Sequence, residues 1–130
     1  PQSERREFRQ KLREEQNVAV RDYAIKWMQH ARAEENSASE KWVQFLQDVF
    51  VVGIPKVRHP YLLFKHQAML RDSATGNFGD LCEKVSRSPA MILYLDLQQN
   101  VRGDPNENFA RELFELFMLG EGNLMPTFSF

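Results

Sequence analysis

Apolar residues recur along this chain at the three- and four-residue spacing of an α-helix. Strict alternation of apolar and polar residues, which would indicate a half-buried strand, is hard to find. The pattern therefore predicts an all-α fold, an irregular helical bundle of about five to six helices.

The first predicted helix begins near Ser3 and changes character along its length. A one-sided apolar stripe marks its second half: Val20, Ala24, Trp27, Met28 and Ala31. Residues 1–16 instead carry a dense mixture of both charge signs, which is typical of a solvated helix face. We expect the second half to pack and the first half to project.

Capping and helix-breaking residues predict the boundaries that follow. Ser37 and Glu40 have the spacing of a capping box and predict the start of a second helix. Glycine and prolines interrupt helical order at residues 53–59, which predicts a loop. Further helices are predicted from Pro60 to about Arg71, over about 78–87, and from Pro89 with Ser88 as its N-cap.

The last predicted helix has the clearest limits. Asp104 is its expected N-cap, Pro105 its first residue, Glu107 the second half of a capping box, and Gly120 its C-terminal stop. More than half of its circumference is apolar: Phe109, Leu113, Phe114, Leu116 and Phe117. We expect this helix to be central in the fold.

The remaining arc of this helix is polar, and a structural interpretation is favoured for it. Glu107, Arg111 and Glu115 follow one another at four-residue spacing, so one guanidinium can meet two carboxylates. With Asn106 and Asp96 they would form a polar network that fixes the helix. Charged groups near a core need paired partners, and that need alone explains why they lie together.

A functional interpretation of the same arc is the alternative. Glu112 and Glu115 lie three residues apart, with Asn108 on the same face. They are the candidate catalytic residues, as a general acid and base, or two oxygen ligands for a hard cation. This interpretation predicts a concave, partly open pocket over the polar arc.

Composition excludes several classes of function. The chain has 130 residues, 42% of them hydrophobic, which suits a single helical domain or domain fragment over 1–130. Its 17 basic and 18 acidic residues give a net charge of −1, so nucleic acid is not an expected partner. No segment is long and apolar enough to span a membrane, and no signal peptide is evident, so the compartment stays open.

The cysteine and histidines do not predict a metal site or a cofactor. Cys82 lies in an apolar stripe and is expected to be a small core residue. No pair among His30, His59 and His66 has the spacing of metal ligands. His59 is expected in a loop and His66 on a helix whose other face is apolar.

Four motifs carry a resemblance to a known family. They read Gly-Asn-Phe-Gly-Asp-Leu at 76–81, Ser-Pro-Ala-Met-Ile-Leu-Tyr-Leu-Asp at 88–96, Pro-Asn-Glu-Asn-Phe-Ala-Arg-Glu-Leu-Phe-Glu-Leu-Phe at 105–117, and Leu-Gly-Glu-Gly-Asn at 119–123. Over about residues 20–123 the chain resembles the bacterial "domain of unknown function 1800" family. The resemblance implies that this is an internal portion of a longer, mainly helical protein. Members of that family often carry export signals and are commonly encoded beside a sulfatase-like family, but no established reaction comes with the resemblance.

The chain departs from the family pattern in two places. Where the family often has Trp-His-x-His-Phe, residues 46–50 read Leu-Gln-Asp-Val-Phe, so both histidines are replaced. Any metal or proton chemistry of those histidines is therefore absent in that form here. Residues 124–130, Leu-Met-Pro-Thr-Phe-Ser-Phe, are an atypical tail.

The sequence thus leads to a helical structural or interaction domain with no demonstrable catalysis. The alternative is a metal-binding or hydrolytic enzyme domain that uses the carboxylates of the helix at 106–115. A third expectation is association with a second copy or with a partner protein, through apolar surface exposed by truncation.

Overall fold

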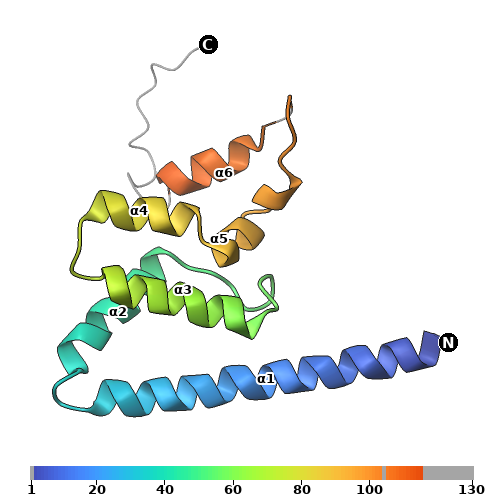
Figure 1. Cartoon of the computed structure of the whole chain (residues 1–130), viewed down its shortest axis with the longest axis horizontal. Coiled ribbons are helices and arrows are strands. Elements are labelled where there is room, and N and C mark those ends of the chain that lie inside the picture. Colours follow the sequence, from blue (N-terminus) through green and yellow to red (C-terminus); the bar gives the residue numbers. More distant parts are fainter. Residues whose placement is uncertain (1, 104, 116–130) are drawn as a thin grey trace.

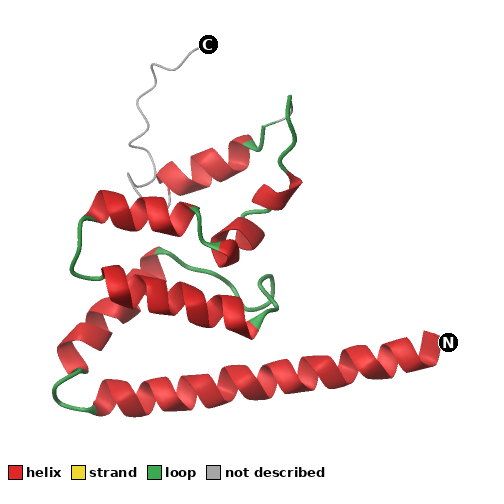
Figure 2. Ribbon diagram, viewed as in Figure 1, coloured by secondary structure: helices red, strands yellow, loops and turns green. Residues whose placement is uncertain are grey.

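The computed structural model describes residues 2–103 and 105–115, and this part of the chain is all-α, as predicted (Figures 1 and 2). It contains six α-helices and one short 3-10 helix, and no strand runs through the described residues. The elements are α1 (Gln2–Arg32), α2 (Ser37–Val49), α3 (Pro60–Ser73), α4 (Phe78–Ser86), α5 (Pro89–Tyr94), η1 (Leu97–Gln99) and α6 (Glu107–Glu112).

Helix α3 is the centre of the arrangement. It packs against α1, α2, α4 and α5, and Figure 1 shows it between α1 on one side and α4 and α5 on the other. The main apolar cluster is Leu46, Phe50, Leu70, Leu81, Cys82, Val85, Met91 and Leu95. Cys82 is a buried core residue, as expected, and burial raises the pKa of its thiol.

Helix α1 is long and attached along only part of its length. None of its 31 residues is buried, and residues 2–15 are all exposed. Its N-terminal half extends past the other helices, while its second half lies along α2 and α3 (Figure 1). Met28, which belongs to the predicted apolar stripe, does not pack as expected, because it is half exposed.

The start of α6 differs from the prediction. Asn106, not Asp104, is the N-cap: its side-chain oxygen accepts a hydrogen bond from the Phe109 amide at 3.1 Å, and the helix begins at Glu107. Asp104, Gly120 and the tail at 124–130 lie outside the described residues.

The expectation that this helix is central is wrong for its described part. No residue of α6 is buried. Phe109 and Leu113 pack against the edge of the core, but Phe114 is 45% exposed. Leu116 and Phe117, which contributed to the expectation, lie outside the described residues.

The predicted capping box at the start of α2 is also wrong. Asn36 precedes the first helical residue, and its side chain makes no capping hydrogen bond. The Glu40 carboxylate does not turn back to cap the helix, because it is bound by side chains of α1 and α3. Ser88 occupies the N-cap position of α5 and Pro89 its first residue, as predicted, although the Ser88 side chain makes no capping hydrogen bond. Pro60 opens α3 as predicted.

Candidate functional site

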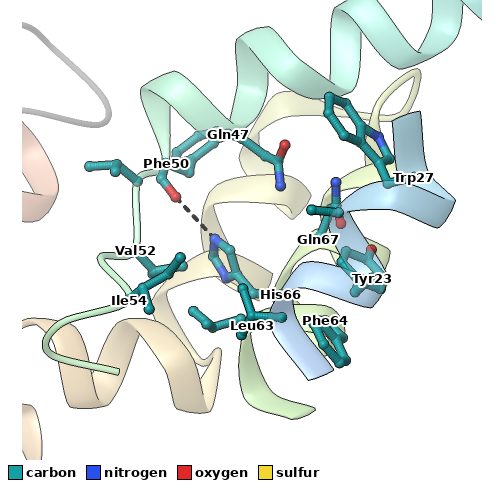
Figure 3. Close-up of a pocket in the computed structure, with 13 residues that line it drawn as sticks. Tyr23, Trp27, Gln47, Phe50, Val52, Ile54, Leu63, Phe64, His66 and Gln67 are labelled. Atoms are coloured by element: carbon teal, nitrogen blue, oxygen red, sulfur yellow. Dashed lines mark hydrogen bonds between the residues drawn. The ribbon is translucent and has the colours of Figure 1, made fainter. Parts of the chain in front are cut away.

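A pocket of about 250 Å³ lies where α1, α2 and α3 meet (Figure 3). Its walls are largely apolar, and aromatic side chains come from all three helices or their ends: Tyr23, Trp27, Phe50 and Phe64. The Tyr23 and Phe64 rings stack with their centroids 4.1 Å apart, which joins α1 to α3 at one side of the pocket. Pockets of this composition take up small molecules with a large apolar surface.

Three polar side chains enter this apolar pocket: Gln47, His66 and Gln67. Figure 3 shows them directed into the space between the helices. A few polar groups set in an apolar wall give a pocket its specificity, because each one requires a matching group on the ligand. The hydrogen bonds of these side chains therefore decide what the pocket can bind.

Gln67 is the polar side chain of this pocket whose hydrogen-bonding capacity is not filled by the described residues. Its residue is 4% exposed, and its side-chain oxygen Oε1 is buried and has no hydrogen-bond partner among the described residues. A buried acceptor left unpaired costs about 1–3 kcal/mol, so such groups are rare in folded proteins. Gln67 also lines the pocket, and its buried oxygen would gain a hydrogen bond if a ligand donor reached it.

His66 is equally buried, but both of its ring nitrogens are engaged. Nε2 lies 3.0 Å from the carbonyl oxygen of Phe50, and Nδ1 lies 2.9 Å from Oγ of Ser88. A carbonyl can only accept, so Nε2 carries the hydrogen. Burial lowers the pKa of His66, and the neutral ring then accepts the Ser88 hydroxyl hydrogen at Nδ1.

Because both ring nitrogens are in hydrogen bonds, His66 connects neighbouring elements and is not available as a free base. It joins the end of α2, the middle of α3 and the first residue before α5. The Ser88 hydroxyl makes no capping hydrogen bond to α5, because it points to His66 instead. The ring therefore contributes to stability and to the pocket wall.

An ion pair between the buried Glu40 and the partly exposed Arg71 lies next to the pocket. Glu40, 3% exposed, accepts two hydrogen bonds from the Arg71 guanidinium, at 2.7 and 3.0 Å. Its second oxygen also accepts from the Trp27 indole N–H at 2.7 Å. Chiefly the hydrogen bond from Arg71 lowers the pKa of Glu40. Through these contacts one carboxylate connects α1, α2 and α3, and it orients the Trp27 ring that lines the pocket.

The residues predicted from the polar arc of α6 are only partly brought together. Arg111 donates to the Asn108 side-chain oxygen at 3.3 Å, and both residues are exposed. Among the described residues, no ion pair joins Arg111 to Glu107 or to Glu115. Glu112 and Glu115 are both half-buried.

Asn106 and Asp96, by contrast, do meet. The Asn106 amide donates to the carbonyl oxygens of Leu95 and Asp96 at 3.3 and 3.4 Å. The Asp96 carboxylate itself pairs with Lys56, with 2.6 Å between Nζ and Oδ2, and this pairing lowers the pKa of Asp96. Asn106 therefore fixes the start of α6 to the turn after α5.

The structure gives no geometric support to a metal centre in the described part of the chain. Within residues 2–103 and 105–115, no three His, Cys, Asp or Glu side chains gather as they would to hold a metal ion. Gln47, at the first of the two positions where the family pattern has a histidine, lines the pocket described above. Val49, at the second, packs against the core.

Sequence reasoning missed the groups that matter most here. Glu40 and Arg71 are 31 residues apart, and His66 and Ser88 are 22 apart, so no local spacing could reveal these pairs. Gln67 did leave a signal, since it lies among Leu63, Phe64 and Leu70 along an otherwise apolar helix face. A polar residue inside such a stripe marks a position to inspect.

No helix, over the ranges that the structure describes, is long and apolar enough to cross a membrane.

Fold and pocket define a small, irregular all-α bundle with an aromatic pocket beside its central helix. The chain belongs to the family described as "Protein of unknown function (DUF1800)", which matches residues 2–124. This confirms the resemblance and extends it over the projecting half of α1. Neither a curated protein nor a solved structure matches the chain significantly. The family description names no reaction, so the function must be argued from the geometry.

Proposed function

We propose that this chain is a binding domain, and that its pocket between α1, α2 and α3 takes up a small apolar or aromatic molecule carrying an N–H or O–H donor. The observation that carries the proposal is that Gln67, whose buried Oε1 has no hydrogen-bond partner among the described residues, lines an aromatic pocket. A ligand donor would satisfy this oxygen, and the aromatic walls would shield the rest of the ligand from water.

The state of the neighbouring groups supports binding over catalysis. His66 has both ring nitrogens in hydrogen bonds, and Glu40 is held by Arg71 and Trp27. A general base must reach the proton it removes, and neither group is available for that in this arrangement. The pocket therefore offers recognition groups and a largely apolar surface.

Indole and 1-methylindole are matched probes for this proposal. They have nearly the same apolar surface, but only indole has an N–H donor for the Gln67 oxygen. We expect calorimetric titration to show tighter binding of indole, and indole to raise the unfolding temperature more. Absence of heat and of thermal stabilisation with indole would refute the proposal.

The variant Gln67→Leu tests the assigned contact. Leucine has a side chain of similar size but no hydrogen-bond acceptor, so the preference for indole over 1-methylindole should disappear. Gln29→Leu is the control, because Gln29 is exposed on α1 and lies outside the residues that line the pocket. An unchanged preference in Gln67→Leu would show that the donor binds elsewhere.

A second candidate function is self-association through α1. This helix exposes several large apolar side chains: Phe8, Leu12, Val18, Ile25 and Met28. Charges of both signs alternate along its projecting half, so two copies of the helix can pair without net repulsion. A second copy of this chain is therefore the proposed partner. Nucleic acid is not, because the net charge is −1.

Sedimentation equilibrium tests this second candidate. A concentration-dependent dimer that Phe8→Glu dissociates would support it, since the substitution places a charge in the proposed contact. A monomer at all concentrations would exclude it, without affecting ligand binding in the pocket.

A further inference from the structure

A second, smaller pocket of about 180 Å³ adjoins the aromatic pocket along α1. The two share Val20, Ile54 and Leu63, so they are neighbouring parts of a groove between α1, α3 and the loop that precedes α3. The chemistry changes along this groove. The aromatic pocket has apolar walls, whereas the second pocket includes Arg13 of α1 and Arg58 of the loop.

Neither arginine is neutralised within the described residues. Their guanidinium groups take part in no ion pair there. The positions three and four residues before and after Arg13 are Arg9, Gln10, Gln16 and Asn17, so α1 offers no carboxylate within a turn on that face. The nearest charged residue to Arg58 in sequence is Lys56, whose charge is taken up by Asp96.

Arg58 is also held in place. Its Nε donates to the carbonyl oxygen of Pro55 at 3.0 Å, which anchors the base of the guanidinium group and leaves its two terminal nitrogens without a partner among the described residues. A guanidinium binds a carboxylate or phosphate through paired hydrogen bonds, and it does so best when its side chain is already ordered. The second pocket thus presents two positive groups, one of them anchored.

From these observations we infer that the natural ligand is an amphiphilic anion. Its apolar or aromatic body fills the aromatic pocket and donates a hydrogen bond to Gln67, and its carboxylate or phosphate lies in the second pocket against Arg13 and Arg58. This inference rests on the proposed function, because it assigns a ligand class to the same groove. Its separate basis is the charge distribution of the second pocket.

Indole-3-butyrate and indole-3-butanol separate the two claims. Both carry the indole body on an arm of similar length, but only the acid is charged. We expect the full chain to bind the acid about tenfold more tightly than the alcohol in calorimetric titration. Added salt should weaken binding of the acid and leave the alcohol unaffected, because it screens the contact with the arginines.

The substitutions Arg13→Gln and Arg58→Gln test the position of the anion. Each should reduce the affinity for indole-3-butyrate several-fold, and the double variant should bind acid and alcohol equally. Arg21→Gln is the matched control, since Arg21 is exposed on the same helix and lines neither pocket. Circular dichroism should show all variants to be folded, because the substituted side chains lie at the surface of the groove.

Each outcome of this experiment decides something. If acid and alcohol bind the unmodified chain equally well, the inference about the anion is wrong and the binding function stands. If the acid binds more tightly but keeps that preference in the double variant, the assigned position is wrong. If neither compound binds, the proposed function and the inference fail together. Comparison with indole-3-propyl phosphate distinguishes a phosphate headgroup from a carboxylate.

Discussion

At the scale of single residues, two arginines of this chain have opposite surroundings. Arg71 makes paired hydrogen bonds to the buried Glu40, whereas Arg111 is exposed and, within the part of the chain that the structure describes, bonds only to Asn108. Arg71→Ala would leave the buried Glu40 carboxylate without its guanidinium partner, and we expect it to lower the free energy of unfolding by about 3 kcal/mol. Urea denaturation followed by circular dichroism measures this change.

Arg111→Ala is the matched control for that experiment. Its denaturation midpoint should equal that of the unmodified chain, because an exposed side chain with one long hydrogen bond contributes little. A large loss of stability in Arg111→Ala would instead support the polar network expected on α6. Equal stability of Arg71→Ala and the unmodified chain would contradict the role assigned to the buried pair.

His66 gives a prediction about pH. Burial lowers the pKa of His66 below its ordinary value of 6.5, so below that pH the unfolded chain binds a proton that the folded chain resists. The free energy of unfolding should therefore be level above pH 6.5 and fall as the pH decreases below it. Below about pH 4.5 the lowered pKa of Glu40 adds a loss in the same direction.

The variant His66→Gln isolates the histidine contribution. It should be less stable than the unmodified chain at pH 7, because the hydrogen bonds to Phe50 and Ser88 are altered. Its stability should depend less on pH just below 6.5, since the titrating group is gone. Identical pH profiles for the two proteins would show that His66 is not shielded from protonation.

The scale of elements shows where sequence patterns succeed. Pro60 and Pro89 fix helix starts correctly, because proline restricts its own backbone and lacks the N–H that a first turn leaves unpaired. These are local effects, so the sequence around each residue suffices. The same holds for the predominance of helix, which follows from the spacing of apolar residues.

The predictions failed at the starts of α2 and α6, where side chains form hydrogen bonds with residues outside their own helix. Glu40 has the spacing of a capping residue, but Arg71 and Trp27 bind its carboxylate. The sequence pattern favours Asp104 as the cap of α6, but Asn106 is the cap, and its amide also donates to the carbonyl oxygens of Leu95 and Asp96. The Glu40 carboxylate takes the hydrogen bonds that tertiary packing supplies in place of a local cap, and single-sequence patterns do not contain that information.

The start of α6 gives the prediction at this scale. Asn106→Ala removes the cap of α6 and two hydrogen bonds to the preceding turn, and we expect it to destabilise the protein by about 1.5 kcal/mol. Asn108→Ala, two residues along, removes only a contact with exposed Arg111 and should be neutral. Equal effects of the two substitutions on thermal unfolding would contradict Asn106 as the cap.

At the scale of the whole molecule, the apolar core and the pocket meet at Phe50, which belongs to both. Leu81, Cys82, Val85 and Met91 bury themselves where α4 and α5 meet α3. The pocket lies on the side of α3 that faces α1, and no α1 residue is buried. The contacts of α1 with this pocket are therefore less buried than those within the core, and we expect them to be the less protected ones.

Gln67 lines the pocket and is not part of the apolar core cluster, so we expect its substitution to change stability and ligand binding in opposite directions. Without ligand, Gln67→Leu should raise the free energy of unfolding by about 1 kcal/mol, because it removes the unpaired buried oxygen. With saturating indole the order should reverse, since only the unmodified chain gains the hydrogen bond to the ligand. Thermal unfolding of both proteins, with and without indole, measures this crossing. If Gln67→Leu is destabilised in the absence of ligand, the oxygen has a partner in solution and the pocket has no open acceptor.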